Sequence, residues 1–139
     1  MYQPAARLYK NTDFRDGLLD RKGRLWIANL NDGVKVIDPA SGQEINLWPD
    51  KENRKLLNLT YIKGILEGID GRIWVATCSR GLFYFDEKRA EFINIESLPV
   101  NKGKYIGGDC INGLQRTADG SILISSWGAY PNSQAQVRS

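Results

Sequence analysis

Short apolar runs, each following a turn that contains glycine, are the main pattern along this chain. Two of these runs are unbroken, Leu25–Ala28 and Ile73–Ala76. An unbroken apolar run of this length predicts a strand that is buried on both faces. No segment carries a credible helical pattern, so the chain is predicted to be all-β.

The strand pattern recurs three times. The turn glycines Gly23, Gly71 and Gly120 are separated by spacings of 48 and 49 residues. Propeller blades repeat at roughly 40–50 residues. The Asp-Gly or Asp-x-x-Gly step at each turn supplies a residue that tolerates positive φ, as a tight hairpin requires. The repeat therefore predicts blades of a β-propeller.

The first two copies contain two further strand signals after the buried run, which makes four short strands per repeat. The predicted third strands are Val34–Asp38 and Leu82–Asp86, and the predicted outer strands are Glu44–Trp48 and Glu91–Ile95. The third copy keeps its hairpin, but residues 129–139 carry neither an apolar third strand nor an outer strand. Residues 6–10 look like an outer strand with no blade before it.

These signals predict a β-propeller fragment of about three four-stranded antiparallel blades, incomplete at both ends. The predicted divisions are 1–12 for an outer strand of a preceding blade, 13–50 for the first blade, 51–100 for the second and 101–139 for a partial third. Propellers close with about four or more blades. We therefore expect either a longer parent chain or a homo-oligomer to cover the apolar end faces. A small unrelated β-sandwich is the alternative fold.

Composition narrows the class of protein. The 139 residues carry a net charge of +3, and Lys and Arg alternate with Asp and Glu, so nothing indicates a nucleic-acid partner. The sequence predicts no membrane span and shows no signal peptide. Histidine, the commonest general base and metal ligand, is absent. No nucleotide-binding glycine motif or other cofactor signal is present.

The blade motif resembles a known family. The pattern Asp-x-x-Gly-x-Leu-Trp-Ile-Ala, followed by x-x-Gly-Val/Leu and an apolar strand ending in Asp, is similar to the two-component regulator propeller repeat. Segments Asp20–Asp38 and Asp70–Asp86 match it, and Asp119–Ser126 match in part. Ala-Asn and Ala-Thr stand where the repeat usually has Gly-Thr, and Leu123 replaces the tryptophan. Related signatures occur in gluconolactonase-like and streptogramin-lyase-like propellers.

The resemblance implies a place in a larger protein. It points to the extracytoplasmic, periplasmic sensor region of a hybrid two-component sensor kinase of the Bacteroidetes type, anchored in the inner membrane. Such regions sense a small-molecule ligand, often an oligosaccharide. The segment itself carries no kinase histidine, so the resemblance implies ligand sensing or its scaffold and no catalytic residue.

Candidate ligand-binding residues come from the loops that join second to third strands and one blade to the next, which share one face of a propeller. Planar hydrogen-bonding side chains and aromatic rings are the residue types that commonly bind sugars. The residues of these types in those loops are Arg80, Trp127, Asn31, Tyr61, Tyr105 and Asp109. The alternative is that they are ordinary loop residues. Trp26 and Trp74 lie inside the apolar runs and are predicted to pack between blades.

Two further questions stay open at the level of sequence. Cys78 and Cys110 lie on the same side of adjacent blades, so they form either a disulfide, which suits an oxidising periplasm, or free buried thiols. Asp16, Glu67 and Asp109 could supply oxygen ligands to a cation in a metal-dependent lactonase-like or lyase-like enzyme. No acid recurs at an inward position in all three copies, so we assign no metal ligand. A structural protein-interaction propeller is the third possibility.

Overall fold

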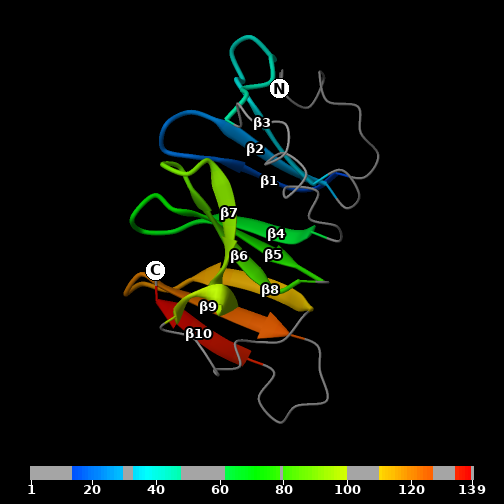
Figure 1. The fold of residues 1–139 in the computed structure, drawn as a ribbon. Coiled ribbons are helices and arrows are strands. Elements are labelled where there is room, and N and C mark those ends of the chain that lie inside the picture. The colour runs from blue at the N-terminus through cyan, green and yellow to red at the C-terminus, as the bar shows by residue number, and fades with distance from the viewer. Residues whose placement is uncertain are drawn as a thin grey trace.

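A computed structural model describes residues 14–29, 33–47, 62–78, 80–99, 110–126 and 134–138. These residues form an all-β structure of three antiparallel sheets, stacked one on the next (Figure 1). This confirms the predicted fold class. The helical structure within the described ranges is one 3-10 turn, η1 (Ile95–Ser97). None of the helical structure in these ranges is long and apolar enough to span a membrane.

Each sheet is built from strands that follow one another in the chain. The first sheet contains β1 (Phe14–Leu19), β2 (Leu25–Asn29) and β3 (Gly33–Ile37), in that order. The second contains β4 (Ile62–Glu67), β5 (Ile73–Thr77), β6 (Leu82–Asp86) and β7 (Glu91–Asn94). The third contains β8 (Ile111–Arg116), β9 (Ser121–Ser126) and β10 (Gln134–Arg138).

The sequence repeat corresponds to a repeat of structure. In each sheet the first strand pairs with the second through a hairpin, and the turn glycines Gly23, Gly71 and Gly120 have φ values of 80°, 85° and 87°. A side chain rarely adopts this left-handed conformation, so glycine is required at these turns. Trp26, Trp74 and Leu123 occupy equivalent register positions, each opposite the second-to-last residue of the first strand in its sheet.

The first strands of the sheets lie side by side, since β1 contacts β4 and β4 contacts β8. The sheets therefore form an arc around their first strands. Because consecutive strands are antiparallel, the β1–β2, β4–β5 and β8–β9 hairpin turns all lie at one end of the sheets, together with the turns after β3 and β6. We call this end the turn face. The opposite end, where residues 78–81 connect β5 to β6, is the loop face.

Two apolar cores lie between the sheets. Trp26 is fully buried in the core between the first and second sheets, and Trp74 is 1% exposed in the core between the second and third. All five residues of β5 are buried, as the unbroken apolar run predicts, because this strand lies between two neighbouring sheets. The prediction that both tryptophans pack between blades is confirmed.

Two strand predictions are wrong. The segment expected to form an outer strand over Glu44–Trp48 forms no strand within its described part, where Glu44 bridges Ile37 and Ile45 N donates to the Val36 carbonyl at 2.7 Å. Ile45 and Leu47 nevertheless pack against the core. The alternating pattern thus correctly indicates which side chains face inward, but side-chain burial does not require a continuous backbone ladder. Trp48 lies outside the described residues.

The tail, in contrast, forms a strand that its composition did not predict. β10 pairs with β9 over its whole length, from Gln134 opposite Ser125 to Arg138 opposite Ser121. Ladder hydrogen bonds are made by backbone groups, so a polar sequence can occupy the edge of a sheet. The three sheets therefore contain three, four and three strands among the described residues.

Candidate functional site: a charged cleft on the turn face

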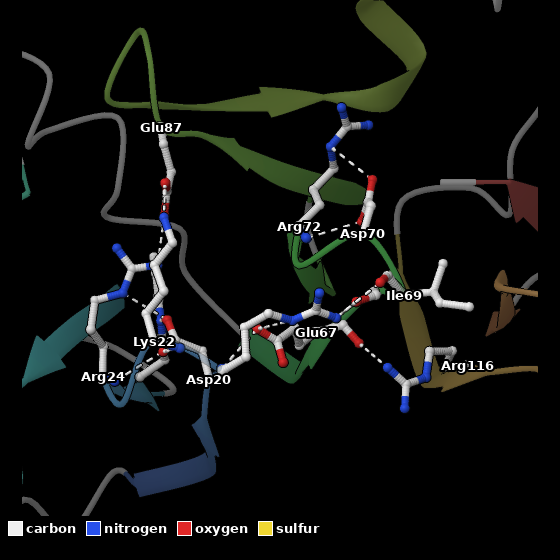
Figure 2. A network of polar contacts seen from close by, with 12 residues as sticks. Asp20, Lys22, Arg24, Glu67, Ile69, Asp70, Arg72, Glu87 and Arg116 are labelled. Atoms are coloured by element: carbon white, nitrogen blue, oxygen red, sulfur yellow. Dashed lines mark hydrogen bonds and ion pairs between the residues drawn. The ribbon is translucent and has the colours of Figure 1, made fainter.

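A cleft of about 550 Å³ opens on the turn face between the first and second sheets. Hairpin turns form most of its wall, because the β1–β2 turn, the β4–β5 turn and the turn after β6 come together there. Its charged lining consists of Arg21, Lys22, Arg24, Arg72 and Lys88 and of Glu67, Asp70, Asp86 and Glu87. Figure 2 shows the polar contacts that connect these turns.

Asp20 organises the turn of the first sheet. Its carboxylate accepts hydrogen bonds from the backbone N–H groups of Lys22 and Arg24, both at 2.9 Å, from Arg24 Nε at 2.7 Å and from the Trp26 indole Nε1 at 2.8 Å. Asp20 is 4% exposed. Burial by itself raises the pKa of Asp20, but the hydrogen bonds from Trp26 and Arg24 outweigh it and hold the pKa below its ordinary value.

Glu87, from the turn after β6, connects the second sheet to this turn. Lys22 Nζ and Arg24 Nη2 each donate to its carboxylate at 2.6 Å. The hydrogen bond from Lys22 is the largest influence on the pKa of Glu87, and with that from Arg24 it lowers the pKa against the effect of burial. Arg24 thus lies between two carboxylates, Asp20 on its own sheet and Glu87 on the next (Figure 2).

Arg21 extends across to the turn of the second sheet. Its backbone N–H donates to Glu67 Oε2 at 3.0 Å, and its Nη2 donates to the Ile69 carbonyl at 2.9 Å. The side chain lies over Gly71, about 3.5 Å from the position that a Cβ atom would occupy there. From the third sheet, Arg116 donates to the Glu67 carbonyl at 3.4 Å. Contacts of Arg21 and Arg116 with the second sheet therefore connect all three sheets on the turn face.

The turns of the first two sheets differ at three aligned positions: Asp20, Arg21 and Lys22 in the first correspond to Gly68, Ile69 and Asp70 in the second. Gly68 stands where the first sheet has Asp20, and the buried Trp74 Nε1 makes no hydrogen bond within the described part of the chain, although the Asp70 carboxylate lies near it. Asp70 accepts a hydrogen bond from the Arg72 backbone N–H at 3.0 Å. The Arg72 guanidinium lies 4.3 Å from the centre of the Tyr84 ring. Sequence reasoning missed this site because it treated the turn residues as structural; the Asp20-to-Gly68 exchange between aligned copies was the available signal.

The structure describes one of the residues that are predicted to bind ligand, Arg80, which lies on the loop face. Arg80 is exposed beside β6, its backbone N–H donates to Thr77 Oγ1 at 3.0 Å, and its carbonyl accepts from Asn94 Nδ2 at 2.8 Å. Asn31, Tyr61, Tyr105, Asp109 and Trp127 lie outside the described residues. Their role as a site stays a prediction.

Near Arg80, Cys78 and Cys110 form a disulfide that links the second sheet to the start of the third. This answers the question that the sequence left open. The bond joins residues 32 positions apart on the loop face, so it fixes the end of β5 against the start of β8.

The candidate cation ligands are engaged in structural contacts. Asp16 accepts hydrogen bonds from the backbone N–H groups of Gly17 and Ile65, and Glu67 pairs with Arg21. Asp109 lies outside the described residues. Within the described ranges, no three Asp, Glu, Cys or His side chains gather in a way that could hold a metal ion.

Neither a protein-family model nor a curated protein sequence matches the chain. Solved structures do resemble it. One is the extracellular domain of BT3049 from B. thetaiotaomicron, assigned to a hybrid two-component system, with 23% identity, a TM-score of 0.59 and coverage of 83% of this chain and 14% of that one. Another is the extracellular domain of BT4673 from the same organism, assigned to a one-component system, with 18% identity, a TM-score of 0.63 and coverage of 94% and 18%.

A third similar structure is an enzyme, virginiamycin B lyase from Staphylococcus aureus, with 15% identity, a TM-score of 0.52 and coverage of 83% of this chain and 35% of the lyase. At these identities the likeness establishes the fold, a segment of a propeller-like array of antiparallel blades. The chain spans less than a fifth of each of the two extracellular domains that it resembles.

Proposed function

We propose that this chain is a segment of an extracytoplasmic β-propeller that senses a ligand for a two-component signalling protein. The observation that carries the proposal is the structural likeness to the extracellular domains of BT3049, described as a hybrid two-component system, and BT4673, described as a one-component system, together with the matching blade motif. The disulfide between Cys78 and Cys110 supports an extracytoplasmic, periplasmic place, because disulfides persist in oxidising compartments.

The ligand that we propose is an oligosaccharide bound on the loop face. The support is the set of residue types in its loops, Arg80 and Trp127 above all, since guanidinium groups and aromatic rings are common partners of sugar hydroxyl groups and sugar faces. Arg80 is exposed and lies two positions after a disulfide-bonded residue, so its backbone is held while its side chain faces solvent. Loop residues on a rigid scaffold are frequent binding residues.

Binding of neutral oligosaccharides would test this proposal by titration calorimetry against the whole chain. We expect one class of glycan to bind, and Arg80→Ala to weaken that binding by about tenfold or more, as loss of a charge-assisted hydrogen bond implies. The matched control is Arg89→Ala, an exposed arginine of the turn face, which should leave affinity unchanged. Absence of binding across the panel, or an equal loss in both variants, would contradict an oligosaccharide site at Arg80.

We also propose that residues 1–12 belong to a preceding blade, that 13–50 and 51–100 form two blades, and that 101–139 begin a third, with the ring completed by further blades or by copies of this chain. Leu123 supports this: it is 38% exposed, whereas its counterparts Trp26 and Trp74 are covered by the next sheet. Light scattering measures the mass in solution. A discrete oligomer would support a ring that is completed by copies of this chain. A stable monomer would contradict the proposal that the chain is an arc with uncovered end faces.

The structural likeness to virginiamycin B lyase favours one alternative, a lyase-like enzyme. A variant of that lyase lacking one histidine is described as catalytically inactive, and this chain contains no histidine. Mass spectrometry of quinupristin incubated with the chain distinguishes the two proposals. We expect the mass to stay unchanged, and a cleaved product would favour the enzyme.

A further inference from the structure

The aligned turns of the first two sheets carry their carboxylates at different positions, Asp20 in the first and Asp70 in the second. In the first, the carboxylate of Asp20 accepts hydrogen bonds from Trp26 Nε1 at 2.8 Å and Arg24 Nε at 2.7 Å. In the second, the corresponding tryptophan and arginine are present as Trp74 and Arg72, but Gly68 brings no carboxylate. The second turn therefore keeps the two donors, but its carboxylate, Asp70, comes from another position and accepts from the Arg72 backbone N–H without a hydrogen bond to Trp74 Nε1.

Trp74 makes the missing acceptor energetically important. Its side chain is 1% exposed, and Nε1 is buried without a hydrogen-bond partner among the described residues. An unsatisfied buried donor costs roughly as much as the desolvation of that group, so such atoms are rare in folded proteins. The position that a Cβ atom would take on Gly68 lies 3.1 Å from this nitrogen and 3.1 Å from Asp70 Oδ1, so the donor lies against the glycine with the Asp70 carboxylate on the same side.

The surroundings are accessible from the cleft. Its wall includes Glu67, Asp70, Gly71 and Arg72, which flank Gly68 in the sequence. The side chains of Asp70 and Arg72 are about two-fifths exposed, and the closest approach between their charged groups is long, 4.0 Å. Figure 2 shows both at the edge of the turn.

We propose that the second turn binds a ligand carboxylate, which accepts a hydrogen bond from Trp74 Nε1 and pairs with Arg72 in the role that Asp20 has in the first sheet. The ligand class is therefore a small carboxylic acid or an acidic sugar. The carboxylate enters from the turn-face cleft, and the rest of the ligand lies in the 550 Å³ space between Arg21 and Tyr84. This site is on the opposite face from Arg80, so the test of carboxylate binding is independent of the test of oligosaccharide binding at Arg80.

Nuclear magnetic resonance of the indole N–H groups tests the site directly. The chain has four tryptophans, and Trp74→Phe identifies the Trp74 signal. We expect sodium formate to shift this signal saturably, beyond the effect of sodium chloride at equal ionic strength. Gly68→Asp supplies the carboxylate internally and should abolish the formate response. No saturable shift in the original chain, or the same shift in Gly68→Asp, would overturn the proposal.

Two further variants keep the test decisive if Gly68→Asp does not fold. Arg72→Gln should weaken formate binding by about tenfold, equivalent to 1.4 kcal/mol, and unchanged affinity would contradict the pairing with Arg72. Asp70 lies near Gly68 and is the internal competitor. If Asp70→Asn moves the Trp74 signal and formate has no effect on the original chain, Asp70 itself is the acceptor and the ligand site is disproved.

Glucuronate and glucose, which differ in the carboxylate, then test the ligand class. We expect glucuronate to reproduce the shift of the Trp74 signal and glucose to leave it in place. If formate binds and glucuronate does not, the turn is too narrow for a carboxylate carried by a larger ligand, and an acidic-sugar ligand is excluded.

Discussion

The indole Nε1 of Trp26 donates a 2.8 Å hydrogen bond to the carboxylate of Asp20, and this bond ties the middle strand of the first sheet to the turn before it. Trp26 also packs into the core shared with the second sheet. One residue thus connects the apolar packing between blades with the polar network of the turn face. The equivalent Trp74 has the packing without the hydrogen bond.

Replacement of Asp20 by alanine should destabilise the fold strongly. The change leaves Trp26 Nε1, two backbone N–H groups and Arg24 Nε without their acceptor, and removal of one partner of a buried ion pair typically costs about 3–5 kcal/mol. The matched control is Asp70→Ala on the aligned second turn, where the side chain is 42% exposed and the cost should be below about 1 kcal/mol. Urea unfolding measures both. Equal costs would contradict the central role of Asp20.

Acid should destabilise the protein partly through Asp20. Its pKa is lower in the folded state than its ordinary value of about 3.9. The ionised carboxylate therefore stabilises the fold above that ordinary value, and this contribution is lost as pH falls through the lower folded pKa. Unfolding curves of the original chain and of Asp20→Asn should converge as pH drops below about 4. Parallel curves would show that Asp20 does not contribute to the acid dependence.

Phenylalanine substitution should distinguish the two tryptophans. Both changes remove similar apolar area, but Trp26→Phe also removes the hydrogen bond to Asp20, while Trp74→Phe removes none that the structure describes. A hydrogen bond to a charged group contributes about 1.5–3 kcal/mol, so Trp26→Phe should cost more by about that amount. Chemical denaturation of the two variants gives the difference. A greater cost for Trp74→Phe would mean that its indole nitrogen is bonded in solution.

Reduction should lower stability through Cys78 and Cys110. The bond closes a loop across 32 positions, for which chain entropy gives about 3–4 kcal/mol. Thiol titration of the unreduced, denatured chain should find no free thiol, and dithiothreitol should lower the unfolding midpoint. The Cys78→Ser/Cys110→Ser variant should show the lower midpoint with or without reductant. Two titratable thiols in the unreduced chain would disprove the bond.

The local sequence pattern predicted the fold well where the side-chain pattern and the backbone conformation indicate the same element. Gly23, Gly71 and Gly120 need positive φ, and β2 and β5 need burial on both faces, so composition at those places was sufficient. The errors fell on strands at sheet edges. Ile45 and Leu47 face the core without a full ladder, and β10 has a ladder from a polar sequence.

The candidate site was harder to predict because its contacts join residues far apart in the chain. Arg21 meets Glu67 and Ile69, and Arg24 meets Glu87, only because neighbouring sheets stack with their turns at the same end. The sequence around a charged turn residue does not indicate which residue of another sheet it contacts. The polar residues that the sequence singled out instead, Arg80 excepted, lie outside the described part of the chain.

The sequence by itself determined the repeat, the strand order within each hairpin and the burial of Trp26 and Trp74, because these depend on periodicity and on the conformations that glycine allows. Only the tertiary structure decided which tryptophan has an acceptor, which cysteines are bonded and which charges meet across the cleft. Those relationships depend on distances between separate sheets, and these are set by how the apolar cores pack.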